Sequence, residues 1–155
     1  MKFSADQDVE ASVSHVFAAV SDFDGLARKA MRRGVQVTRL DNLDGPVAGM
    51  AWEAVFSFRG KARKLHIELV EVDAPNGLSA KSQTKGLDTR LVLGLVAMSK
   101  ARTRMSIELE LMPQSLAARL LVQSLKLARG TVSKRLKGRL AEFAKLTAES
   151  YRHTG

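Results

Sequence analysis

The apolar residues of this chain change from strand-like to helical spacing at Pro113, and this change limits the folds open to the chain. From residue 103 to residue 111 they recur at every second position, with Arg, Ser and Glu between them. That period is typical of a strand with one buried face. Beyond Ser115 the steps are three or four residues, which predicts one long C-terminal helix with a single apolar stripe. The stripe consists of Leu121, Leu125, Ala128, Val132, Leu136, Leu140 and Phe143.

Further strands are expected before this point. Residues 50–58 and 65–69 both alternate between apolar and more polar side chains. The phase then slips, because Val70 and Val72 are the next apolar members, and a β-bulge that bends the strand is predicted there. Shorter strands are expected over residues 2–11, 35–41, 78–85 and 86–99, with two short helices between the first two of them.

These elements predict a single α+β domain over residues 1–155. A sheet with one apolar face has to cover that face, and the long helix is the element available to do so. We therefore expect a curved antiparallel sheet of about six to seven strands wrapped around the C-terminal helix. Wrapping leaves a volume between sheet and helix. Either large strand residues fill it and the core is solid, or a guest molecule occupies it, and the periodicity does not decide between the two.

Three segments carry a resemblance to a known superfamily. They are residues 9–17 followed by 20–23, residues 32–40, and residues 102–105 leading to Pro113. On these segments the chain resembles the START-like or helix-grip proteins, also called SRPBCC, which include polyketide cyclases/dehydrases and lipid-transport domains. The resemblance spans nearly the whole chain. It implies a helix-grip fold with a cavity for an apolar ligand such as a lipid, polyketide, sterol or quinone. It transfers no catalytic residue, because no shared catalytic motif matches, and fold alone does not imply function.

The strand and helix phases predict which residues would face such a cavity. Large apolar side chains would supply affinity through burial, and a few polar groups would fix the orientation of the ligand. Ser82 and Thr84 are the polar candidates, because they share the alternation of Leu78 and Ala80. The predicted apolar contacts are Trp52, Phe56, Phe58, Leu65, Ile67, Met105, Ile107, Leu125, Ala128 and Val132.

The chain carries little of the chemistry that catalysis or metal binding requires. It has no cysteine, and its three histidines lie far apart in the sequence without metal-ligand spacing. No nucleotide-binding loop or hydrolase elbow motif is present. His66 and Glu68 share one strand face and could form an acid–base pair, although a solvated surface pair is the simpler interpretation. We expect no metal, no cofactor and no assignable catalytic residue.

The positive charge is concentrated near the C-terminus. Nine bases stand against two acids over residues 114–155, so this segment carries +7 of the net charge of +9. The basic C-terminal helix could be a solvated face, or it could dock on an anionic membrane surface or an acidic protein. Nucleic acid is disfavoured, because exposed aromatics do not alternate with the bases. Residues 91–98 are apolar without clear alternation, which leaves a homodimer or cover by the N-terminal helices open.

Three functional hypotheses follow. The preferred one is binding or carriage of a small hydrophobic ligand. The first alternative is an enzyme of the polyketide cyclase/dehydrase type that uses the same cavity. The second is an interaction module that docks through the basic helix. The N-terminus lacks the apolar core of a signal peptide and no apolar run approaches ~20 residues, so we expect a cytoplasmic protein.

Overall fold

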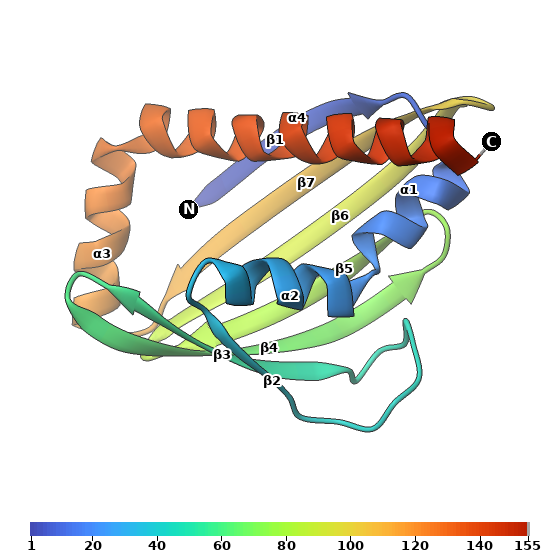
Figure 1. Ribbon diagram of the computed structural model, residues 1–155. Helices are drawn as coiled ribbons and strands as arrows, with labels where there is room; N and C mark the ends of the chain where they lie inside the picture. Colours follow the sequence, from blue (N-terminus) through green and yellow to red (C-terminus); the bar gives the residue numbers. More distant parts are fainter. Residues whose placement is uncertain (155) are drawn as a thin grey trace.

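The computed structural model describes residues 1–154, and these form one curved sheet with helices on its concave side (Figure 1). The strands are β1 (Lys2–Val9), β2 (Gln36–Arg39), β3 (Ala51–Phe58), β4 (Lys61–Asp73), β5 (Gly77–Thr84), β6 (Leu87–Ser99) and β7 (Arg102–Pro113). The helices are α1 (Val13–Val20), α2 (Phe23–Arg32), α3 (Leu116–Leu127) and α4 (Arg129–Thr154). No helix among these residues is both long enough and apolar enough to cross a bilayer.

All seven strands pair antiparallel in the order β1-β7-β6-β5-β4-β3-β2. Strands β2 to β7 follow one another as a meander, and β1, the first strand, pairs with β7 at the edge opposite β2. The predicted helix-grip architecture is therefore confirmed, with seven strands and two short helices after the first strand. The predicted bulge is also present, since the β4–β5 register shifts between Leu69 and Glu71.

The C-terminal region differs from the prediction of one long helix. The helical stripe is continuous in spacing, but the chain turns at Ala128, where φ is −99° and ψ is 18°. Helix α4 then leaves in a clearly different direction and crosses the concave face of the sheet (Figure 1). Gly130 lies just beyond the turn, and a Cβ at Gly130 would meet no neighbouring atom within 4 Å. Close packing therefore does not explain this glycine, whereas its position next to the break does.

The two C-terminal helices cover different parts of the core. Helix α3 buries Ala118 and Val122 against a small cluster that contains Phe3, Leu87 and Leu111. Helix α4 buries Leu140 and Ala144 in the larger cluster, together with α1 and the middle of the sheet. Residues Val132 and Leu136 at the start of α4 also pack against the small cluster, so the break lies where the chain passes from one apolar region to the other.

Polar contacts connect the N-terminal strand to its partner. Arg104 and Arg102 of β7 donate hydrogen bonds to the carboxylate of Asp8, at 2.9 Å and 2.8 Å for the shortest contacts. They lower the pKa of Asp8 to about 2. The buried Thr103 hydroxyl donates to the Ala11 carbonyl at 2.9 Å, where β1 ends and α1 is about to begin. These contacts fix the junction between β1 and α1 relative to β7.

Candidate functional site: an apolar cavity

A cavity of about 610 Å³ lies between the concave face of the sheet and helices α2 and α4. This volume falls within the usual range for small-molecule sites, ~300–1,000 Å³. The space is therefore not completely filled by side chains, which answers the question that the sequence left open. The site is built from the inward-facing positions of the meander, where side chains of alternate residues share one face.

Twenty of the twenty-one lining residues are apolar, and Arg139 is the exception. Strands β2 to β7 form the floor, while α2 and α4 form the walls. The apolar lining residues are Val20, Phe23, Leu26, Ala27, Ala30, Val35, Val37, Trp52, Ala54, Phe56, Leu65, Ile67, Leu69, Leu78, Ala80, Leu91, Leu93, Met105, Leu140 and Phe143.

Helix α2 is the unusual wall. Asp22 caps it, because the Asp22 carboxylate accepts a hydrogen bond from the Gly25 amide at 3.1 Å. None of its residues is buried, although Leu26, Ala27 and Ala30 line the cavity. A helix that buries no residue gains little from packing. The partial exposure of its apolar side chains is what a cavity beneath them would produce.

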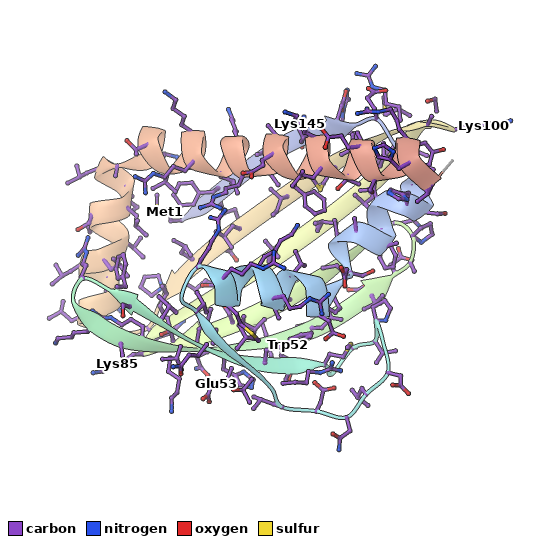
Figure 2. The ribbon with its side chains drawn as sticks, viewed as in Figure 1. Met1, Trp52, Glu53, Lys85, Lys100 and Lys145 are labelled. Atoms are coloured by element: carbon purple, nitrogen blue, oxygen red, sulfur yellow. The ribbon has the colours of Figure 1, made fainter. Side chains whose placement is uncertain are left out.

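Trp52, labelled in Figure 2, is the largest side chain of the floor. Its position is fixed from two sides. The Phe23 ring meets the Trp52 ring edge-on, with centroids 5.1 Å apart. The Arg39 guanidinium lies 5.4 Å from the Trp52 ring centroid. Arg39 is itself held by two 2.7 Å hydrogen bonds to Asp41, which lower the pKa of that carboxyl well below its usual range. The Trp52 ring is thereby held in place as a fixed part of the cavity floor.

Arg139 is the one charged side chain on the lining. It lies on α4 among three inward-facing apolar residues, Leu136, Leu140 and Phe143. Within residues 1–154 the structure shows neither an ion pair nor a hydrogen bond for its guanidinium. Arginine stays protonated in proteins. The cavity therefore has apolar surroundings with one exposed cation at its α4 wall.

Five of the twelve residues predicted from the sequence line this cavity: Trp52, Phe56, Leu65, Ile67 and Met105. The break at Ala128 explains part of the difference for the other seven. Ala128 is exposed at the turn itself, and Leu125 and Val132 pack against the small cluster rather than toward the cavity.

The remaining four also lie outside the lining. Phe58 is exposed at the end of β3, and Ile107 packs against the larger core cluster. Ser82 and Thr84 continue the Ala80 face toward the end of β5, beyond the cavity. The Thr84 hydroxyl donates to the Lys64 carbonyl at 2.7 Å. No polar strand residue therefore faces the cavity.

The lining residues that were not predicted differ in how clear a signal the sequence carries for them. Leu69, Leu78 and Ala80 follow the predicted strand phases, so the alternation of the strands already places them on the cavity face. Helix α2 carries small and apolar residues at helical spacing, but nothing in the spacing shows that they face a cavity. Arg139 is one base in a basic segment and has no signal of its own.

The acid–base pair considered from the sequence lies away from the cavity. Neither His66 nor Glu68 lines it, and Glu68 instead pairs with Lys81 at 3.4 Å. His15 approaches the Ser150 hydroxyl at 2.7 Å and meets the Tyr151 ring edge-on, which connects α1 to the end of α4. The Ser150 hydroxyl donates to the Thr147 carbonyl, so its proton is not directed at His15. Across residues 1–154, no group of three or more His, Asp or Glu side chains could hold a metal ion.

A family model described as "Polyketide cyclase / dehydrase and lipid transport" matches residues 1–147. The chain belongs to this family. A sequence comparison with curated proteins finds no match. The family assignment agrees with the helix-grip architecture and with the position of the cavity between sheet and C-terminal helix.

Solved structures share the fold of this polyketide cyclase/dehydrase and lipid transport family member at low sequence identity. TTHA0849 from Thermus thermophilus has a TM-score of 0.69 at 16% identity, over 97% of this chain and 98% of that one. The Zhui aromatase/cyclase from Streptomyces sp. R1128 has a TM-score of 0.67 at 11% identity, over 94% and 93%. Norcoclaurine synthase from Thalictrum flavum, in complex with dopamine and hydroxybenzaldehyde, has a TM-score of 0.65 at 15% identity, over 96% and 87%. At such identities the likeness establishes the fold alone.

Proposed function

We propose that this protein binds and carries a small hydrophobic ligand in the cavity between the sheet, α2 and α4. The observation that carries the proposal is the 610 Å³ space with its almost wholly apolar lining. Burial of apolar surface contributes ~25 cal/mol per Å², so a lining of this kind favours an apolar guest over water. The family description, which includes lipid transport, supports the same function.

Arg139 narrows the class of ligand. A cation without a partner, at the wall of an apolar cavity, favours a molecule with an apolar body and one anionic group, such as a long-chain carboxylate. The guanidinium can donate two parallel hydrogen bonds to a carboxylate. Neutral ligands such as sterols or quinones would fill the same space but leave this donor unused.

The enzymatic alternative fits the lining less well. Cyclase and dehydrase chemistry needs a group that accepts or donates a proton beside the substrate. None of the twenty-one lining residues carries a carboxyl, imidazole or hydroxyl group. The guanidinium of Arg139 retains its proton, so it could bind a carbonyl but not exchange a proton with it. Binding and carriage therefore fit these side chains better than catalysis does.

The test compares oleate with oleyl alcohol, which has the same chain without the charge. Ligand-stripped protein is titrated with each, and displacement of an apolar fluorescent dye reports binding. We expect oleate to bind roughly three- to tenfold more tightly than the alcohol, because an ion pair near solvent is worth only about one kcal/mol. In Arg139→Gln this difference should disappear while the affinity for the alcohol stays the same.

Lys137→Gln is the matched control. Lys137 is an exposed base on the same helix, two residues away and so on the opposite side, and it does not line the cavity. It should keep the preference for oleate. If neither molecule binds, and a panel of other lipids and quinones also leaves the melting temperature unchanged, the carriage proposal is wrong. Equal affinity of the wild type for both molecules would refute only the anionic-ligand part.

A further inference from the structure

Helix α3 leaves a row of leucines in solvent. Leu116, Leu120 and Leu127 are 72%, 62% and 93% exposed. Steps of four and seven residues place all three on one side of a helix, and the opposite side buries Ala118 and Val122. The row spans eleven residues, which is ~16 Å at 1.5 Å per residue. Isolated exposed leucines are ordinary on protein surfaces, whereas a straight row of this length on one helix marks an interaction surface.

Basic residues gather around the same end of the molecule. The ladders place the β5–β6 turn and the end of β7 together, because Thr84 pairs with Leu87 and Leu87 pairs with Pro113. The contact between Thr84 and the Lys64 carbonyl adds the start of β4 to this group. The Gly86 carbonyl accepts a hydrogen bond from the Gln114 amide, so the β5–β6 turn lies beside the start of α3. Figure 1 draws the β3–β4 turn at the same end of the sheet, and Figure 2 labels Lys85 there, with Lys100 at the opposite end.

We call this surface the α3 end. Its exposed apolar side chains are the three leucines and Phe58, which is 41% exposed. Among the described residues the structure shows an ion pair for only one of its bases, a 3.9 Å contact between Lys64 and Glu53. The α3 end therefore combines a row of exposed leucines with a strong positive charge. Its bases are Arg59, Lys61, Arg63, Lys64, Lys85, Arg119 and Lys126.

We propose that the α3 end docks on the surface of an anionic lipid bilayer. A helix with one apolar side and bases beside it is the arrangement that lies at a membrane interface, with its leucines among the acyl chains and its bases at the headgroups. A nucleic acid would attract the bases but would provide no apolar surroundings for the leucine side chains. The charge complementarity thus favours a phospholipid surface. The bases lie on α3 and two turns of the sheet, whereas the sequence pointed to the basic C-terminal helix as a whole.

The docking surface is separate from the cavity, since no residue of α3 lines it. The inference therefore goes beyond the proposed function and does not depend on it. For a protein that carries an apolar ligand, docking would bring the cavity to a membrane from which the ligand could be taken.

Co-sedimentation of the full chain with lipid vesicles tests the proposal. One set of vesicles is phosphatidylcholine alone, and the other contains phosphatidylglycerol as well. We expect binding to the phosphatidylglycerol vesicles, with loss of binding as salt shortens the screening length, and much weaker binding to phosphatidylcholine alone. The variant Leu116→Gln/Leu120→Gln/Leu127→Gln keeps every charge and should bind roughly tenfold more weakly or worse.

Two further variants keep the test decisive. Val96→Thr/Met98→Thr removes exposed apolar side chains at the opposite end of the sheet, where they are 60% and 49% exposed, and should bind like the wild type. Arg119→Glu/Lys126→Glu keeps the leucines and should lose roughly tenfold or more on phosphatidylglycerol vesicles, which decides the matter if the leucine variant fails to fold. The proposal is overturned if the wild type does not sediment with phosphatidylglycerol vesicles. It is equally overturned if a folded leucine variant binds as well as the wild type, or if the control loses as much as the leucine variant.

Discussion

Filling the cavity from the sheet side should raise the stability of the protein and lower its capacity for ligand. Ala80 lies in the middle of the floor, where its ladder partners are Leu69 on β4 and Leu91 on β6, and all three line the cavity. Although Ala80 lies in a central strand of the sheet, it is only half-buried, because part of its surface faces the cavity. The variant Ala80→Leu would place three more carbon atoms in that space.

The size of the effect follows from burial. At ~0.8 kcal/mol per buried carbon, three carbons stabilise the ligand-free protein by at most about 2.4 kcal/mol. For a chain of this length, about 2–4 °C of melting temperature corresponds to each kcal/mol. The ligand-free variant should therefore melt up to about 5–10 °C higher than the wild type. A core already filled to normal density would respond in the opposite way, with a loss of about 1–3 kcal/mol from overpacking.

Thermal unfolding of ligand-stripped protein measures the first effect, and dye displacement by oleate measures the second. Ala62→Leu, on the exposed face at the start of β4, adds the same atoms outside the cavity and should change neither. A lower melting temperature for Ala80→Leu would refute the reasoning, because it would mean that side chains already fill the space. Unchanged oleate affinity together with a higher melting temperature would place the ligand somewhere else.

Three further predictions concern the framework around the cavity. Asp8 has a lowered pKa, so its stabilising contribution is complete above pH 3.8 and is lost as the pH falls from 3.8 toward about 2. In Asp8→Asn the free energy of unfolding, measured with denaturant, should therefore depend less on pH in that window. Thr103→Val keeps the shape of the side chain but leaves the Ala11 carbonyl without its donor, so the free energy of unfolding should fall by about 1–2 kcal/mol in the same assay. An unchanged free energy of unfolding would show that water replaces the hydroxyl. Gly77→Ala should cost about 1–3 kcal/mol, since the added methyl would collide with the Leu93 carbonyl oxygen, and a neutral result would mean that β5 can shift.

The sheet and its curvature could be predicted because they depend on local pattern. Alternation in β3, β4 and β7 shows which residues share a face, and the slip after Leu69 marks the bulge that the register contains. These signals lie within single strands. The resemblance to the helix-grip proteins then supplied the arrangement of the strands, which alternation alone does not specify.

The break at Ala128 could not be predicted from spacing. The apolar stripe passes through Ala128 without a change of period, since a helix that turns can keep its periodicity in both halves. The break follows from the apolar partners of the two halves. Val122 of α3 packs in the small cluster with Phe3, and Leu140 of α4 packs in the larger cluster. Gly130 was the only sign of it, and a single glycine in a helix has several explanations.

The extent of the cavity was equally beyond the sequence. Spacing shows that Trp52 and Ile67 share a face, but not how far α2 stands from that face. The same limitation applies to Arg139, whose neighbours in the sequence are also basic. Arg139 is exposed like the bases beside it, and only the crossing of α4 over the sheet places it on the cavity lining.

The pairing of β1 with β7 has a consequence for the order of events during synthesis. Lys2 lies opposite Glu110, so β1 leaves the ribosome before the other strands of this sheet and waits for a partner more than a hundred residues later. The hairpins from β3 to β7 pair only with their neighbours and can form earlier, whereas contacts of long sequence separation form slowly. Leu140 and Phe143, which complete the cavity wall, arrive later still. Until α4 has been synthesised, the nascent chain therefore lacks one wall of the cavity, and loading of any ligand has to follow the synthesis of α4.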